Sequence, residues 1–190
     1  MTLKFLIIIL ASYFIGCFCT AYYYGIMFKN KDIRNFGSGN LGALNSWRVL
    51  GKGSFIIVLS IDFLKGFMVI IIGRFFSLSN TSLFIIMFAV IMGHMFPVQL
   101  KFKGGKGIAT FMGALTAYNY LFTIIIIITF MPIYCIMRKF TISGLISIIF
   151  FPVLIFIIGY PSKNTEAFVM LIFTVIIILK HKKNILNIIK

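Results

Sequence analysis

Long apolar runs separated by short basic segments leave this chain few folds to choose from. Of its 190 residues, 61% are hydrophobic and only 11% are charged, whereas a soluble domain carries about 25% charged residues. So few charges cannot cover a soluble protein with groups that water solvates. The composition therefore predicts an integral membrane protein built from apolar helices.

A membrane-crossing helix needs roughly 20 mostly apolar residues, and the candidate spans lie at residues 3–28, 55–73, 83–100, 142–159 and 167–179. A further run, residues 107–137, is too long for one untilted span and contains Asn119 between two tyrosines. We expect two short helices there, turning at Asn119. The predicted fold class is an all-α polytopic membrane protein with about seven transmembrane helices, forming a single membrane-embedded domain over residues 1–190.

The basic residues predict the orientation of these spans. With seven crossings, most of the 18 Lys and Arg residues fall on one side of the membrane. The positive-inside rule places that side in the cytoplasm, so the N-terminus is outside and the C-terminus is cytoplasmic. A lipoprotein-type cleavage before Cys17 is the weaker alternative, because it would export the basic segment between Lys29 and Lys52.

Acidic side chains are scarce, since Asp32, Asp62 and Glu166 are the only 3 in the sequence. Dispersed carboxylates cannot form a paired hydrolytic site or a metal cage, and the cysteines lack the spacing of metal ligands. We therefore expect no metal and no cofactor. The net charge of +15 indicates anionic partners, namely phosphate groups, phosphorylated substrates or anionic lipid. Nucleic acid is not an expected partner, because the charges lie in short segments between apolar runs.

Small and polar residues dominate residues 37–48, which read GSGNLGALNSWR on the predicted cytoplasmic side and are called here the Gly-Ser-Asn segment. Glycines let backbone N–H groups approach an anion closely, Ser and Asn add hydrogen bonds, and an arginine offers a fork for phosphate. The candidate substrate-binding residues are Ser38, Gly39, Asn40, Asn45 and Arg48. A turn that only leads into the next span explains the GSGN run equally well.

A second cytoplasmic segment, residues 101–107 (KFKGGKG), precedes an expected helix and is called the glycine loop. Exposed amides, the positive end of the helix dipole and a lysine ammonium would converge on a phosphate there. The candidate phosphate-binding residues are Gly104, Gly105, Lys106 and Gly107. The segment is not a P-loop, because Gly107 stands where a Ser or Thr is required. An ordinary basic loop with glycines for turning is the alternative.

Asp62 and Lys65 lie at positions i and i+3 inside one apolar run. Charges in membrane spans usually point into the helix bundle and pair, so we predict a structural ion pair that orients the Gly-Ser-Asn segment. A proton relay is the alternative. His94, late in the run 83–100, is predicted to be a hydrogen-bonding structural residue rather than a base.

Three polar residues near the ends of the last spans, Ser143, His181 and Asn184, fall on the same predicted side of the membrane. His181 and Asn184 share a face if the tail is helical, and Ser143 follows two basic residues. We expect these three to join the two segments in one polar site. A basic tail that binds anionic lipid is the alternative.

Taken together, these segments resemble the bacterial acyl-phosphate:glycerol-3-phosphate acyltransferase family, PlsY. The motifs, in the family's order, are GSGNLGALNSWR at 37–48, DFLKG at 62–66, GHMFPVQLKFKGGKGIAT at 93–110 and HKKNI at 181–185. Two positions depart from the family pattern, since Leu44 replaces a common threonine and Asn187 replaces an arginine of the tail.

The resemblance implies transfer of a fatty acyl group from acyl phosphate to the 1-hydroxyl of glycerol 3-phosphate, giving lysophosphatidate and phosphate in the first acylation of phospholipid synthesis. It also implies a multi-pass protein of the bacterial inner (cell) membrane, surrounded by lipid, with the acyl-phosphate-producing enzyme as a candidate partner. By matching position, the polar site is lined by Ser38, Arg48, Lys106, Ser143, His181 and Asn184.

An acyl phosphate is already activated, so no covalent intermediate is needed. Catalysis would rest on holding two anionic substrates together and stabilising the leaving phosphate, with Arg48 and Lys106 as the expected contacts. The hydroxyl proton has two candidate acceptors, which are His181 and an oxygen of the acyl phosphate itself, the latter favoured by the resemblance. A small transporter of a phosphorylated metabolite and a lipid-binding structural protein are the rival function classes.

Overall fold

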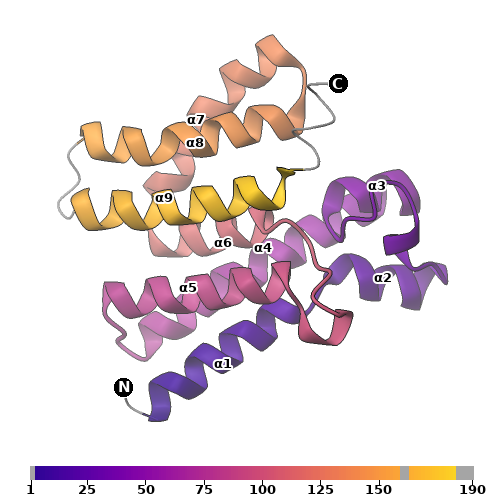
Figure 1. Cartoon of the computed structure of the whole chain (residues 1–190), viewed down its shortest axis with the longest axis horizontal. Helices are drawn as coiled ribbons and strands as arrows, with labels where there is room; N and C mark the ends of the chain where they lie inside the picture. Colours follow the sequence, from indigo (N-terminus) through magenta and orange to yellow (C-terminus); the bar gives the residue numbers. More distant parts are fainter. Residues whose placement is uncertain (1–2, 159–162, 183–190) are drawn as a thin grey trace. The chain divides into compact units, whose positions relative to one another are not determined.

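The computed structural model describes residues 3–158 and 163–182, and over these residues its regular structure is helical (Figure 1). The chain divides into two compact units, Met1–Tyr118 and Asn119–Lys190. The expectation of helices throughout is confirmed. A single domain over the whole chain stays a prediction.

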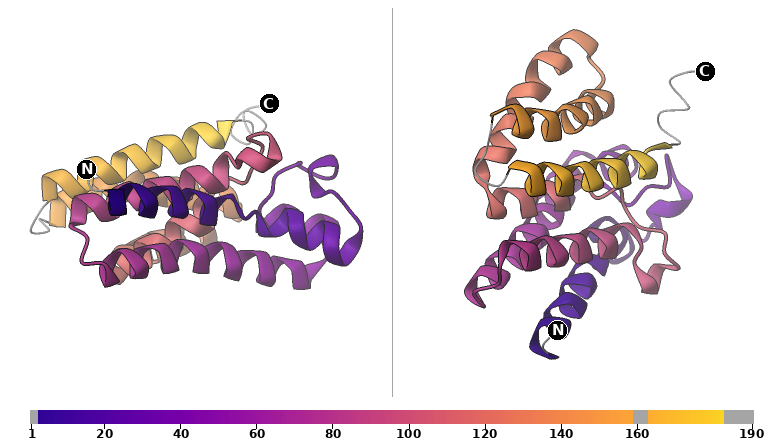
Figure 2. Two further views of the ribbon diagram at one scale, coloured as in Figure 1. Left: turned by 90° about the horizontal axis from the view of Figure 1, so that it is seen from below. Right: turned by 60° about the vertical axis from the view of Figure 1, so that its left-hand side comes forward.

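The first unit begins with two helices, α1 (Leu3–Cys17) and α2 (Thr20–Lys29), which meet at a bend of 44°. Figure 2 shows this change of direction in the indigo and violet helices. The chain continues through the 3-10 turn η1 (Ile33–Asn35), α3 (Ala43–Leu50), α4 (Lys52–Phe75), α5 (Asn80–Met95), η2 (Val98–Leu100) and α6 (Ile108–Tyr118). The break leaves backbone carbonyl groups of α1 without the partners that a continuous helix would supply.

The second half of the Gly-Ser-Asn segment is the helix α3, where a turn or anion loop was expected. Residues 43–50 contain no Gly or Pro, so nothing in them opposes a helix. Gly42 precedes α3 in an extended conformation and Gly51 ends it at a φ of +96°, a value that favours glycine. Arg48 therefore projects from a helix rather than from a flexible loop.

The first unit's helices α4 and α6 approach each other through glycines. A Cβ on Gly66 would overlap the carbonyl oxygen of Thr110, and a Cβ on Gly113 would overlap that of Phe63. α1 approaches α5 in the same way at Gly16. Small residues allow such backbone contact between membrane helices, where dispersion replaces the hydrophobic effect as the driving force.

Asn119 separates α6 from α7 (Tyr120–Met137), as the sequence predicts. Its Oδ1 accepts a hydrogen bond of 3.0 Å from the Leu121 N–H, so Asn119 caps the N-terminus of α7. The cap satisfies a backbone donor that the new helix cannot satisfy itself. An apolar stretch of this length thus becomes two helices because of one capping residue.

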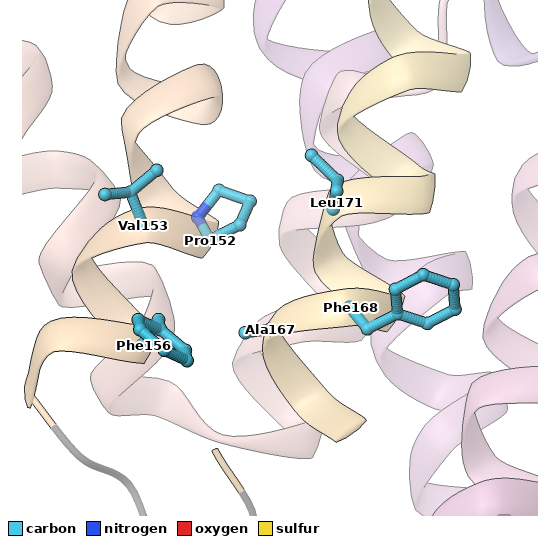
Figure 3. Close-up of a pocket in the computed structure, with 6 residues that line it drawn as sticks. All are labelled: Pro152, Val153, Phe156, Ala167, Phe168 and Leu171. Carbon is cyan, nitrogen blue, oxygen red and sulfur yellow. The ribbon is translucent and has the colours of Figure 1, made fainter. Parts of the chain in front are cut away.

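The second unit contains α7, α8 (Phe140–Ile158) and α9 (Lys163–Lys180), with α8 packed against both neighbours. Phe122 and Phe151 meet edge to face across α7 and α8, with ring centroids 5.5 Å apart. A groove of about 390 Å³ lies between α8 and α9 and is lined by Pro152, Val153, Phe156, Ala167, Phe168 and Leu171 (Figure 3). Its lining carries no charged side chain, so it is not a phosphate site.

Among the described residues, four helical stretches are long and apolar enough to cross a bilayer: α4, α5 extended through η2, α7 and α8. The bent pair α1 and α2 adds a fifth if it is one broken span. α6 is apolar but has only 11 residues. Seven crossings and the cytoplasmic position of the basic segments stay predictions.

Candidate active site

Asn45, at the start of α3, closes the Gly-Ser-Asn segment on itself. The side chain is 1% exposed; its Oδ1 accepts from the Ser38 N–H at 2.8 Å, and its Nδ2 donates to the Phe36 carbonyl at 3.1 Å. Gly37 and Gly39 have φ values of +60° and +67°, where glycine is favoured. The segment is therefore a preformed turn that presents Ser38, and the Asn45 amide holds it.

The glycine loop folds back onto the end of α5. The N–H groups of Gly104 and Gly105 donate to the carbonyls of Met95 and His94, at 3.2 and 3.0 Å. The sequence suggested that these amides face an anion, but the structure uses both inside the protein. These two glycines therefore shape the loop. Gly107, at a φ of +83°, makes the turn that starts α6.

The Gly-Ser-Asn segment and the glycine loop touch each other. The carbonyl oxygen of Leu41 lies 3.0 Å from where a Cβ on Gly105 would be. The next residue, Lys106, is half-buried, and its pKa is lowered to about 8, first by burial and second by the positive charge of Arg48. The two cations predicted for the site are thus close enough to act on each other electrostatically.

The carboxylates of the first unit bind other cations. Asp32 pairs with Arg34 at 2.6 Å, a bond that holds the pKa of Asp32 below its usual value. Asp62 pairs with Lys65 at 2.9 Å inside the unit. The positive charges of Arg48 and Lys106 lie close enough together for Arg48 to lower the pKa of Lys106, and such a pair of charges suits an anionic ligand.

Ser143 and His181 belong to the second unit and are both buried. Ser143 Oγ donates to the Lys139 carbonyl at 3.0 Å, and His181 Nδ1 lies 2.8 Å from the Ile177 carbonyl. Because a carbonyl only accepts, Nδ1 carries the proton, and a neutral ring then has its lone pair on Nε2. Asn184 lies outside the described residues.

Two hydroxyl groups that the sequence analysis did not select stand out. Ser46 and Thr110 are completely buried, and neither side-chain oxygen has a hydrogen-bond partner among the described residues. Such groups are rare in native structures. Their only sequence signal is their place inside the motifs at 37–48 and 93–110. No group of three or more His, Cys, Asp or Glu residues in the described part of the chain could hold a metal ion.

The profile of a family described as glycerol-3-phosphate acyltransferase matches residues 6–190. The chain belongs to this family. Glycerol-3-phosphate acyltransferase 1 of Bacillus thuringiensis subsp. konkukian is 40% identical over 171 residues, covering 90% of this chain and 93% of the relative. Glycerol-3-phosphate acyltransferase 2 of Lactobacillus acidophilus is 40% identical over 188 residues, covering 98% of this chain and 87% of the relative.

Two solved structures of this acyltransferase family share the fold. Crystal structures of PlsY (YgiH), an integral membrane glycerol 3-phosphate acyltransferase, cover 98% of this chain and 92% of theirs. The glycerol 3-phosphate form matches with a TM-score of 0.85 at 30% identity, and the lysophosphatidic acid form with 0.83 at 29%. The resemblance to PlsY and the class of all-α polytopic membrane protein are confirmed.

Proposed function

We propose that the protein transfers a fatty acyl group from acyl phosphate to the 1-hydroxyl of glycerol 3-phosphate, releasing phosphate and lysophosphatidate. One observation carries this proposal: Lys106 and Arg48 act on each other where the Gly-Ser-Asn segment and the glycine loop meet. An excess of positive charge favours the simultaneous binding of two phosphate groups that would otherwise repel each other. Family membership supplies glycerol 3-phosphate as the acceptor.

The proposed chemistry needs no covalent enzyme intermediate. The 1-hydroxyl oxygen attacks the carbonyl carbon of the acyl phosphate, the bond from that carbon to the phosphate oxygen breaks, and its electron pair leaves with the phosphate. Lys106 and Arg48 bind the phosphates and stabilise the charge on the leaving group. On the strength of the family motifs, the proposal also gives substrate-binding or supporting roles to Ser38, Gly39, Asn40, Asn45, Gly104, Gly105, Gly107, Ser143, His181 and Asn184.

The hydroxyl proton goes to an oxygen of the acyl phosphate in the proposed reaction. The tautomer of His181, with its proton on Nδ1, also makes Nε2 of a neutral ring a proton acceptor. The variant His181→Ala distinguishes these two routes. If it folds correctly and keeps its affinity for glycerol 3-phosphate but loses turnover, with a shifted pH profile, the proton goes to His181.

The reaction is tested by phosphate release from palmitoyl phosphate, using purified protein in detergent with and without glycerol 3-phosphate. The proposal predicts release that requires glycerol 3-phosphate and yields one lysophosphatidate per phosphate. A folded protein that binds glycerol 3-phosphate but releases nothing would instead support a transporter of a phosphorylated metabolite.

The cellular setting of the proposed reaction is the bacterial inner membrane, where an acyl chain arrives through lipid and glycerol 3-phosphate arrives from water. An acyl-phosphate-producing enzyme must supply the donor. The apolar helices α4, α5, α7 and α8 fit this membrane setting.

The KM for glycerol 3-phosphate is expected to rise on the alkaline side because of Lys106. Its pKa of about 8 leaves the ammonium charged below that pH, and the charge is lost as the pH rises through it. Between pH 7 and 9 the KM should rise about tenfold, as for a single required proton. Lys106→Arg should remove this rise, since an arginine stays protonated. An equal alkaline rise in Lys106→Arg would contradict the assignment.

Asn45→Asp is expected to raise the KM for glycerol 3-phosphate about tenfold. The carboxylate cannot donate to the Phe36 carbonyl as the Asn45 amide does, and it adds negative charge beside the anion site. Asn35→Asp, at an exposed position two residues before the Gly-Ser-Asn segment, is the matched control for the added negative charge. A similar KM change in both variants would show that charge alone, and not the held turn, is responsible.

A further inference from the structure

Four polar side chains of the first unit form one buried network, consisting of Thr20, Asp62, Lys65 and His94. All are between 2% and 7% exposed. Thr20 Oγ1 donates to Asp62 Oδ1 at 2.9 Å, and Lys65 Nζ donates to the same oxygen at 2.9 Å. The network joins α2, α4 and α5 and holds one negative and one positive charge, so it is electrically balanced.

Lys65 also connects the break in the first span to His94. Its Nζ donates to the Phe18 carbonyl at 2.8 Å, just past the end of α1, and lies 3.2 Å from the carbonyl of Gly16 in the last turn of α1. It lies 2.7 Å from His94 Nδ1. An ammonium has no lone pair, so Nδ1 must accept, and a neutral ring then carries its proton on Nε2.

The other edge of the His94 ring lies against the glycine loop. A Cβ on Gly105 would overlap His94 Nε2, and the Gly105 N–H donates to the His94 carbonyl at 3.0 Å. The same Cβ position is also 3.0 Å from the Leu41 carbonyl oxygen. Gly105 is therefore in close contact with both the imidazole and the Gly-Ser-Asn segment, and the next residue is Lys106.

We propose that His94, held by the Asp62–Lys65 ion pair, is a positioning residue that sets the conformation of the glycine loop and thereby the place of the Lys106 ammonium. The inference rests on the proposed function for its catalytic consequence, but its structural part stands without it. The network contacts the glycine loop through His94, whereas the sequence suggested that the ion pair orients the Gly-Ser-Asn segment. The glycine loop in turn contacts that segment where Gly105 meets the Leu41 carbonyl.

The structural part is tested by hydrogen–deuterium exchange of peptides that cover residues 101–108. His94→Ala removes the ring but leaves the ion pair in place, so the fold should survive. We expect exchange in the glycine loop to rise at least tenfold in His94→Ala and to recover largely in His94→Asn, whose Oδ1 can replace Nδ1 as acceptor. Unchanged exchange in His94→Ala would overturn the proposal, whether or not the protein is an acyltransferase.

A matched control separates positioning from general loss of stability. Arg74, on α4 like Lys65, donates from Nη2 to the Tyr118 carbonyl at 2.5 Å, away from the glycine loop. Arg74→Met should lower the melting temperature without raising exchange in residues 101–108. Equal exchange in Arg74→Met and His94→Ala would mean that the network is merely structural. If His94→Ala does not fold, Asp62→Asn combined with Lys65→Met removes both charges together. Exchange in residues 101–108 of that double variant then tests whether the network sets the conformation of the glycine loop.

The catalytic part is tested by a double-mutant cycle on the KM for glycerol 3-phosphate. If His94 acts by placing Lys106, then Lys106→Met should cost at least fivefold less in the His94→Ala background than in the wild type. Lys103→Met, at an exposed lysine of the same loop, should have the same effect in both backgrounds. Additive effects of His94→Ala and Lys106→Met would overturn the proposal. A wild-type protein without activity would instead contradict the proposed function, and exchange would still decide the structural part.

Discussion

Lys106→Ala is expected to lower kcat/KM for glycerol 3-phosphate-dependent phosphate release by roughly a hundredfold or more, the usual cost of losing one group that stabilises transition-state charge. Lys106 is half-buried beside Arg48, and its lowered pKa reflects both conditions. A phosphate bound there would offset the repulsion between the two positive charges. The remaining Arg48 cannot replace the missing ammonium, because it projects from α3 rather than from the glycine loop.

Lys103→Ala is the control for this first expectation. Lys103 is exposed and lies in the same loop, so its removal changes the net charge equally without reaching the buried side of the site. It should change kcat/KM by less than about threefold, as exposed charges usually do. Comparable losses in both variants would mean that the loop attracts substrate by its overall charge. Phosphate release and the melting temperature are measured on the same preparations, so that an unfolded variant is recognised.

Gly66→Ala is expected to destabilise the first unit by about 3 kcal/mol, at the upper end of ordinary overpacking. A Cβ on Gly66 would overlap the Thr110 carbonyl oxygen, and backbone cannot move aside as a flexible side chain can. α4 and α6 would have to separate along their contact. Because α6 follows the glycine loop directly, activity should fall together with stability.

Gly53→Ala is the matched control, since Gly53 also lies in α4 but a Cβ there would meet nothing within 4 Å. It should be neutral or more stable by up to about 1 kcal/mol, because alanine is the better helix former. Unfolding can be followed with a thiol-reactive fluorogenic dye, since Cys17 and Cys19 are buried in this unit. Cys135 is exposed, so a Cys135→Ser background removes its signal. Equal stability of the two alanine variants would contradict the close approach of α4 and α6.

Much of this protein could be predicted from sequence wherever the signal is local. Apolar runs predict helices because, in a bilayer, a helix satisfies all of its backbone hydrogen bonds within one segment. Asn119 predicts a helix boundary because its short amide can cap the next helix. The pairing of Asp62 with Lys65 follows from their spacing on one helical face. In each case a few neighbouring residues contain the whole physical cause.

Contacts between distant residues could not be read in this way. The amides of Gly104 and Gly105 looked available to an anion, but the end of α5 lies beside them and its carbonyls accept both. Asn45 looked like a substrate ligand, although its amide closes the turn around Ser38. These outcomes depend on which backbone groups of other elements lie within hydrogen-bonding distance, and no local pattern encodes that.

The sequence by itself determined that this chain is a helical membrane protein of the glycerol-3-phosphate acyltransferase family, with an excess of positive charge in two glycine-containing segments. Only the tertiary structure decided that these segments touch at Leu41 and Gly105, and that His94 lies against the glycine loop while bound to Lys65. The physical reason is burial: composition shows which charges exist, but only packing decides which of them lose water and must find partners inside the protein.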